Sequence, residues 1–166
     1  MNLYIIRHAS AEEPGTRPDS QRLLTDKGRE KMRKIARGLT RLDVRLDLIL
    51  TSPYARARET ADILADTFRL AADKIRVSEH LTPCSLTDQL IDEINTKYRE
   101  TEDMALVGHE PFLSELVSVL LTGNPVLEVT VGKGGVCALT IEKLCDGRWA
   151  TLEWLMPPSH LALLGL

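Results

Sequence analysis

Short apolar segments alternate with longer amphipathic segments along most of the chain, and this alternation constrains the fold more than any other feature. The apolar segments have the length of buried strands, and they cover residues 2–7, 47–51, 75–77 and 104–108. The amphipathic segments repeat apolar residues three or four positions apart, which is the spacing of one helix face. Strands that alternate with helices in this way predict an α/β layer fold.

The amphipathic segments predict four helices. The first begins after Thr25, whose hydroxyl can cap the first turn, and the second spans residues 53–69. The third covers residues 86–100, and the fourth begins near Pro111. The apolar stripes that should face the sheet are Met32, Ile35, Ala36 and Leu39; Ala57, Thr60, Ala61 and Leu64; Leu86, Leu90, Ile91 and Ile94; and Phe112, Leu116, Val119 and Leu120.

The last third of the chain has a different pattern. Residues 136–142 and 149–154 alternate apolar and polar side chains, as half-buried strands do. The segment Cys145-Asp146-Gly147-Arg148 lies between them, and Asp-Gly is a strong hairpin signal. We therefore expect a C-terminal antiparallel hairpin, which makes a mostly parallel sheet mixed. Since 166 residues fit one domain and no linker or repeat interrupts them, we expect a single domain over residues 1–166.

Composition argues against several classes of protein. A net charge of -3 and an aromatic content of 4% disfavour a nucleic-acid surface, which needs basic and stacking side chains. No apolar run approaches the roughly 20 residues that span a bilayer, and Met1-Asn2 leads into the first strand without an export signal. Cys84, Cys137 and Cys145 are odd in number and lack CxxC spacing, which disfavours a disulfide framework or a zinc site. We expect a cytoplasmic protein with no membrane partner.

Three predicted strands lead directly to an arginine or a histidine. Arg7 and His8 end the first strand, Arg56 lies in the first turn of the helix after the second, and His109 follows the strand at 104–108. Ligands of open α/β sheets bind outside the carboxyl ends of the strands. Two arginines and two histidines at that edge predict a pocket for a small dianion, of which phosphate fits best.

Other residues near these strand ends are predicted to have supporting or structural roles. Ser52 lacks the G-x-S-x-G elbow of a nucleophilic serine, so we interpret it as a capping or phosphate-contacting residue. Arg58 is interpreted as a solvated helix residue. The segment Val131-Gly132-Lys133-Gly134-Gly135 lacks a P-loop pattern and a following helix. It predicts a β-turn, with Lys133 as a candidate for the rim of the pocket.

In order along the chain, these motifs resemble those of the histidine phosphatase superfamily, also called phosphoglycerate-mutase-like. The family's Arg-His-Gly appears as Arg7-His8-Ala9, with alanine in place of glycine. Its Ser-Pro-x-x-Arg-Ala-x-x-Thr runs without a gap from Ser52 to Thr60, and its Gly-His is Gly108-His109. The chain looks more specifically like the small SixA-type phosphohistidine phosphatases, with which it shares its short length and the segments Asp19-Ser20-x-Arg22-x-Leu24-Thr25 and Leu81-Thr82-Pro83-Cys84.

The resemblance implies a three-layer α/β/α sandwich and a two-step phosphatase mechanism without metal or cofactor. His8 would attack phosphorus to give a phosphohistidine, which water would then hydrolyse. Arg7, Arg56 and His109 would bind the three equatorial oxygens, where negative charge spreads in the transition state. Arginine suits this task because its planar fork binds phosphate through two bonds and stays charged.

The proton donor for the leaving group stays open. Glu79 and His80 follow the third strand, where related phosphatases carry a carboxyl, but they could equally be exposed loop residues. Asp19 is the candidate from the loop shared with SixA-type proteins, although an aspartate before a helix is often only a turn former. A site without a strong acid favours phosphohistidine, because imidazole (conjugate-acid pKa about 6.5) leaves far more easily than an alkoxide (about 15).

The expected substrate is therefore phosphohistidine on a signalling protein, such as a histidine phosphotransfer domain. One alternative is a phosphatase of the same chemistry that acts on a small-molecule phosphomonoester. The other is a non-catalytic module that binds phosphorylated partners. The intact set of Arg7, His8, Arg56 and His109 argues against this last possibility.

Overall fold

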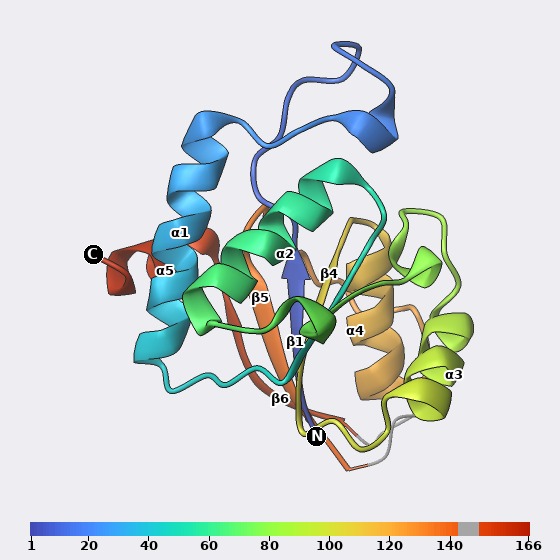
Figure 1. Cartoon of the computed structure of the whole chain (residues 1–166). Coiled ribbons are helices and arrows are strands. Elements are labelled where there is room, and N and C mark those ends of the chain that lie inside the picture. Colours follow the sequence, from blue (N-terminus) through green and yellow to red (C-terminus); the bar gives the residue numbers. More distant parts are fainter. Residues whose placement is uncertain (143–149) are drawn as a thin grey trace.

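A mixed β-sheet lies at the centre of the molecule in the computed structural model, which describes residues 1–142 and 150–166 (Figure 1). Within these residues the sheet has six strands in the order β3-β2-β4-β1-β5-β6. The strands are β1 (Asn2–Arg7), β2 (Leu48–Thr51), β3 (Ile75–Val77), β4 (Asp103–Gly108), β5 (Val136–Ile141) and β6 (Ala150–Met156). Strands β1 to β4 are parallel to one another, whereas β5 is antiparallel to both β1 and β6.

The predicted mixed sheet with antiparallel C-terminal strands is thus confirmed. The order of the strands, in which β1 lies between β4 and β5, could not be read from the sequence pattern. The turn predicted at Cys145-Asp146-Gly147-Arg148, and the predicted strand start at Trp149, lie outside the described residues.

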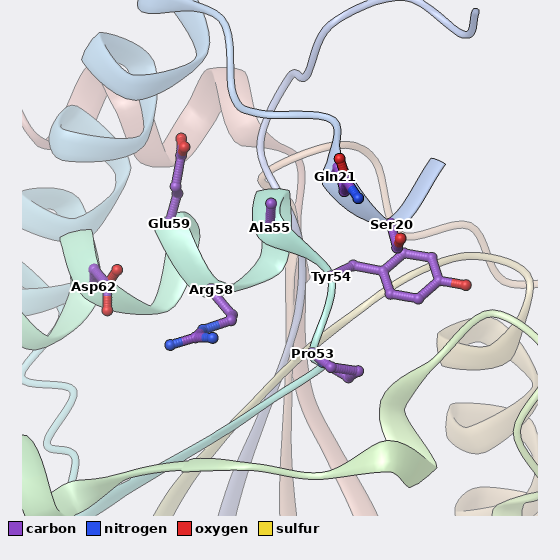
Figure 2. A pocket seen from close by; sticks show the side chains of 8 residues that line it. All are labelled: Ser20, Gln21, Pro53, Tyr54, Ala55, Arg58, Glu59 and Asp62. Carbon is purple, nitrogen blue, oxygen red and sulfur yellow. The ribbon is translucent and has the colours of Figure 1, made fainter. Parts of the chain in front are cut away.

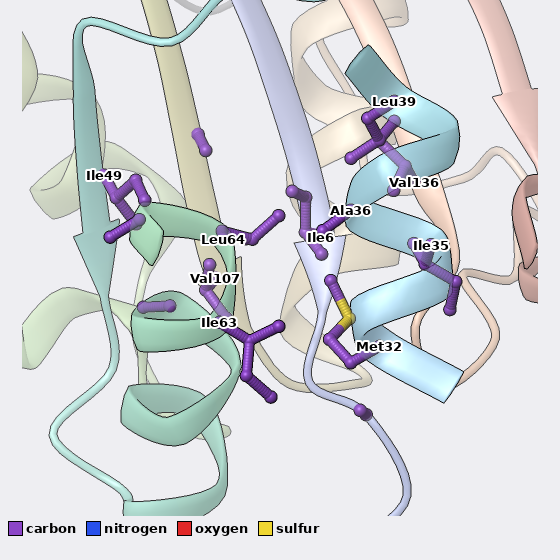
Figure 3. Close-up of a cluster of buried hydrophobic side chains, with 14 of the residues drawn as sticks. Ile6, Met32, Ile35, Ala36, Leu39, Ile49, Ile63, Leu64, Val107 and Val136 are labelled. Carbon is purple, nitrogen blue, oxygen red and sulfur yellow. The ribbon is translucent and has the colours of Figure 1, made fainter. Parts of the chain in front are cut away.

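Helices cover both faces of this sheet and complete the expected three-layer α/β/α sandwich (Figure 1). One face carries α1 (Asp26–Arg41), α2 (Ala55–Phe68) and α5 (Pro158–Leu164), and the other carries α3 (Thr87–Lys97) and α4 (Phe112–Thr122). Successive side chains of a strand point to opposite faces. In β1, Ile6 joins the core beneath α1 and α2 (Figure 3), whereas Leu3 and Ile5 join the core beneath α3 and α4.

The predicted helix stripes are buried with one exception. The Thr25 hydroxyl accepts a hydrogen bond from the Gly28 N–H at 3.0 Å and caps α1 as predicted. Leu86, predicted to face inward, is instead 55% exposed, because it precedes the first turn of α3. The other three members of that stripe, Leu90, Ile91 and Ile94, are buried.

The C-terminal helix α5 has no counterpart among the predicted helices. Its seven residues are too few to display a helical repeat of apolar positions. The helix packs against α1 at Gly38, where an added Cβ would stand 2.1 Å from the carbonyl oxygen of Leu161. Only glycine allows the two backbones to approach so closely.

Candidate active site

The carboxyl ends of β1, β2 and β4 bring the four predicted residues into one cavity. The pairing of β1 with β4 sets Arg7 opposite Gly108, and the His8 N–H donates to the Gly108 carbonyl oxygen at 3.1 Å. The imidazole rings of His8 and His109 then lie 5.0 Å apart between centroids. The cavity has a volume of about 320 Å³, and its wall contains Arg7, His8, Arg56 and His109 together with Glu12, Glu13, Pro14, Arg22, Pro83, Glu110 and Lys133.

A larger groove of about 630 Å³ lies next to this cavity along the start of α2. Figure 2 shows its wall, which includes Tyr54 and Arg58. The Tyr54 ring links the groove to the cavity: Tyr54 lines the groove, and its ring centroid is 4.9 Å from that of His109, which lines the cavity. Arg58 is exposed, as predicted for a solvated helix residue. The groove wall contains no histidine, so the reactive side chains gather in the smaller cavity.

His8 is a buried, neutral imidazole with one nitrogen prepared for attack. Its Nδ1 lies 2.7 Å from the carbonyl oxygen of Ala9, which can only accept, so Nδ1 carries the proton. The lone pair is therefore on Nε2, which accepts a hydrogen bond from Arg56 Nε at 3.1 Å. Burial lowers the pKa of His8 to about 3; the Ala9 bond raises it, and the positive charges of Arg56, Arg7 and Lys133 lower it further.

Hydrogen bonds to backbone carbonyl groups and to one carboxylate hold the two arginines in place. Arg56, only 3% exposed, donates from Nη1 to the Asp19 carbonyl oxygen and from Nη2 to the Asp19 carboxylate at 3.1 Å. Arg7 donates from Nη1 to the Val131 carbonyl oxygen at 3.0 Å. Its Nε is buried and has no hydrogen-bond partner in the part of the chain that the structure describes. Because an unpaired buried donor is costly, this N–H suits an oxyanion.

His109 is also neutral, but its contacts suit it to donate a hydrogen bond, whereas His8 presents a lone pair. Burial, followed by the electrostatic interactions with His8 and Arg56, lowers its pKa to about 3. Its Nε2 lies 2.8 Å from Ser52 Oγ, which already accepts the Tyr54 N–H at 3.3 Å. The serine hydroxyl can donate as well as accept, so this contact is compatible with the tautomer in which Ser52 donates to Nε2 and the proton of His109 is on Nδ1. That buried nitrogen has no partner within residues 1–142 and 150–166, so it can donate to a ligand.

The three candidate proton donors lie outside the cavity wall. Asp19, whose side chain is 56% exposed, forms ion pairs with Arg22 at 2.6 Å and with Arg56 at 3.1 Å. Partial burial raises the pKa of Asp19, but the hydrogen bonds and charges of the two arginines outweigh it and the net pKa is lowered. Glu79 is exposed and His80 is half-buried, both in a 3₁₀ turn at Glu79–Leu81. The assignment of a donor therefore stays a prediction.

Several residues of the site were not singled out from the sequence, or were given another role. Thr60, predicted only as part of an apolar stripe, accepts the Ala9 N–H at 3.1 Å and donates to the Arg56 carbonyl oxygen at 2.7 Å. It thereby ties the loop after β1 to α2. Lys133 lines the cavity, as proposed for the rim, and the predicted turn is found at residues 133–134. Glu110 also lines the cavity. Its position directly after His109 in the sequence could have identified it as a residue of the site.

Two observations on the described ranges complete the description. No group of three His, Cys, Asp or Glu side chains there is arranged to hold a metal ion. No helix in the same ranges is long and apolar enough to cross a bilayer.

Comparison with known proteins identifies the class to which this fold and site belong. The family model for the histidine phosphatase superfamily (branch 1) matches residues 3–88, which is just over half of the chain. The chain belongs to this superfamily.

Individual relatives have names that are more specific than the description of the family. The phosphohistidine phosphatase SixA of Escherichia coli is 26% identical over 164 residues, which cover 98% of each chain. The SixA homolog of Haemophilus influenzae is 32% identical over 134 residues, which cover 76% of this chain and 81% of the relative. The solved structure of the protein histidine phosphatase SixA complexed with tungstate superposes with a TM-score of 0.82 at 26% identity, covering 97% of this chain and 99% of the other.

Proposed function

We propose that this protein is a metal-independent phosphatase that hydrolyses phosphohistidine on a protein through a covalent phosphohistidine at His8. The observation that carries the proposal is the neutral His8 imidazole, whose Nε2 lone pair lies in a cavity with Arg7, Arg56 and His109. A neutral imidazole is a good nucleophile, and the surrounding donors match the oxygens of a phosphoryl group. The likeness to SixA, solved with the tetrahedral oxyanion tungstate, supports the same ligand class.

In the first step, His8 Nε2 exchanges its hydrogen bond with Arg56 Nε for the substrate, and its lone pair attacks phosphorus in line. The bond from phosphorus to the leaving group breaks, and its electron pair leaves with that group. Arg7 Nε, the guanidinium of Arg56 and His109 Nδ1–H donate to the three equatorial oxygens as their negative charge develops. In the second step, water attacks phosphorus from the opposite side. The N–P bond breaks, the electron pair returns to Nε2, and inorganic phosphate leaves.

The choice of substrate follows from the groups that could protonate a leaving group. Asp19 is held by two arginines that lower its pKa, so it is a poor acid near neutral pH. In the cavity wall, Glu12 accepts hydrogen bonds from Arg17 and the Leu23 N–H, and Glu110 accepts from backbone N–H groups. Phosphohistidine needs the least help, because its imidazole leaves far more readily than an alkoxide. Its expected carrier is a signalling protein such as a histidine phosphotransfer domain.

The test compares turnover of three substrates: a phosphohistidine-bearing phosphotransfer domain, an aryl phosphate and an alkyl phosphate. We expect turnover of the first two, which have good leaving groups, and almost none of the third. Equal turnover of the alkyl phosphate would indicate a small-molecule phosphomonoesterase. Turnover of none of them above that of the His8→Ala variant would indicate a phosphate-binding module without catalysis.

A further inference from the structure

Glu110 lines the cavity directly after His109, yet no step of the proposed reaction uses it. Its carboxylate accepts three hydrogen bonds, and none of them comes from His109 or Arg56. Oε1 accepts from the Val131 N–H at 2.8 Å and from Ser114 Oγ at 2.7 Å, and Oε2 accepts from the Ser114 N–H at 3.0 Å. Both oxygens are thus engaged with this chain, which favours a holding role over proton exchange with a substrate.

Capping of α4 explains part of this arrangement. The first N–H groups of a helix lack partners within the helix, and a carboxylate there is also favoured by the helix dipole. The bonds from Ser114, in the first turn of α4, fit that role. The bond from Val131 does not, because Val131 lies 21 positions further along the chain, in the segment between α4 and β5.

The peptide groups of Val131 connect Glu110 to the proposed phosphate ligand Arg7. The Val131 N–H donates to Glu110, and its carbonyl oxygen accepts from Arg7 Nη1 at 3.0 Å. Val131 is fully buried, so neither group can turn to water instead. Two further bonds hold the backbone of Arg7 to the same segment, from the Gly134 N–H to the Arg7 carbonyl and from the Arg7 N–H to the Gly135 carbonyl.

We propose that Glu110 is a positioning residue, which orients the Arg7 guanidinium through the backbone of Val131. This inference rests on the proposed function, because it takes Arg7 as a phosphate ligand. With Nη1 fixed by the Val131 carbonyl, the buried Nε of Arg7 is held in a defined direction for an oxyanion. Loss of the carboxylate would leave the Val131 N–H buried without an acceptor and would let the segment shift. A displacement of about 1 Å can cost up to 100-fold in such a site.

A double-mutant cycle tests this connection. Inorganic phosphate is the binding probe, by calorimetry, and an aryl phosphate gives kcat and KM for Glu110→Ala, Glu110→Gln, Arg7→Ala and the double variants. We expect Glu110→Ala to weaken phosphate binding about 10- to 100-fold, mainly through KM. Glu110→Gln should lose less, because its amide oxygen can still accept the Val131 N–H. The matched control Glu115→Gln removes an exposed carboxylate from the first turn of α4, which Glu110 caps, and should change neither value.

The decisive result is the effect of Glu110→Ala in the absence of Arg7. A residue that acts through Arg7 should have almost no further effect on phosphate binding in the Arg7→Ala background. An equal loss in both backgrounds, or no loss with Arg7 present, would overturn the inference. If Glu110→Ala does not fold, the same cycle with Glu110→Met decides, because the methionine side chain fills the space but offers no oxygen to accept the Val131 N–H.

The same data separate this inference from the proposed function. Phosphate binding that needs Arg7 but is insensitive to Glu110 defeats the inference alone. A wild-type protein that binds no phosphate and turns over no aryl phosphate defeats both.

Discussion

The protonation of His8 gives the most quantitative prediction, and acidification from pH 7.5 to pH 5 is the perturbation. An ordinary histidine, with a pKa of about 6.5, is about 97% protonated at pH 5 and is no longer a nucleophile. Burial and the charges of Arg56, Arg7 and Lys133 lower the pKa of His8 to about 3 despite the Ala9 bond. We therefore expect its imidazole to stay neutral throughout this range.

The same shift predicts a loss of stability in acid. The unfolded chain takes up a proton at this histidine as the pH falls through about 6.5, whereas the folded state does so only near pH 3. The free energy of unfolding that the neutral His8 contributes is fully present above pH 6.5 and is lost progressively as the pH falls towards 3. At pH 5 the loss due to His8 amounts to about 2 kcal/mol.

Two measurements check this prediction against a His8→Gln variant, which lacks the titrating group. NMR titration of the imidazole C2–H resonances from pH 3.5 to 8, assigned with the variant, should show no midpoint for His8 above pH 4. Urea unfolding at pH 7.5 and pH 5 should show that the wild type loses about 2 kcal/mol more than the variant between the two pH values. A His8 midpoint near 6.5, or equal losses for both proteins, would refute the reasoning.

Two further substitutions test other contacts of the site. Asp19→Asn should slow hydrolysis of phosphohistidine and of an aryl phosphate by the same factor in steady-state assays, because Asp19 holds Arg56. A selective loss with the aryl phosphate, whose leaving group needs a proton more, would instead make Asp19 the proton donor. Thr60→Val leaves the buried Ala9 N–H without its acceptor and should cost about 1–3 kcal/mol of unfolding free energy in urea. A cost below about 0.5 kcal/mol would contradict this role.

The sequence predicted the arrangement of the four central residues because one geometric rule governs it. Parallel strands present their carboxyl ends at one edge, so the residues that end or follow β1, β2 and β4 had to meet there. These residues are Arg7, His8, Arg56 and His109. The strands and amphipathic helices could be predicted equally well, because apolar residues recur in the sequence with the period of each buried element. The short helix α5 was missed because its seven residues show no full period. Leu86 was wrongly predicted to face inward because the period does not fix the residue at which α3 begins.

The hydrogen bonds that tune the site could not be predicted in the same way. The tautomer of His8 depends on the direction of one backbone carbonyl, that of Ala9. The contact from Glu110 to Val131 depends on the path of the segment between α4 and β5, which forms neither a helix nor a strand. Such contacts between positions far apart in the chain depend on the tertiary fold. They therefore leave no local pattern for sequence reasoning to detect.

The central claim is that His8 carries the phosphoryl group during the reaction. It is tested most directly by rapid quenching of the protein with a phosphodonor, followed by phosphate analysis and peptide mapping. We predict acid-labile, alkali-stable phosphate on His8 in the wild type, and none in His8→Ala. The absence of phosphoprotein with every donor, or phosphate that persists in His8→Ala, would contradict the claim.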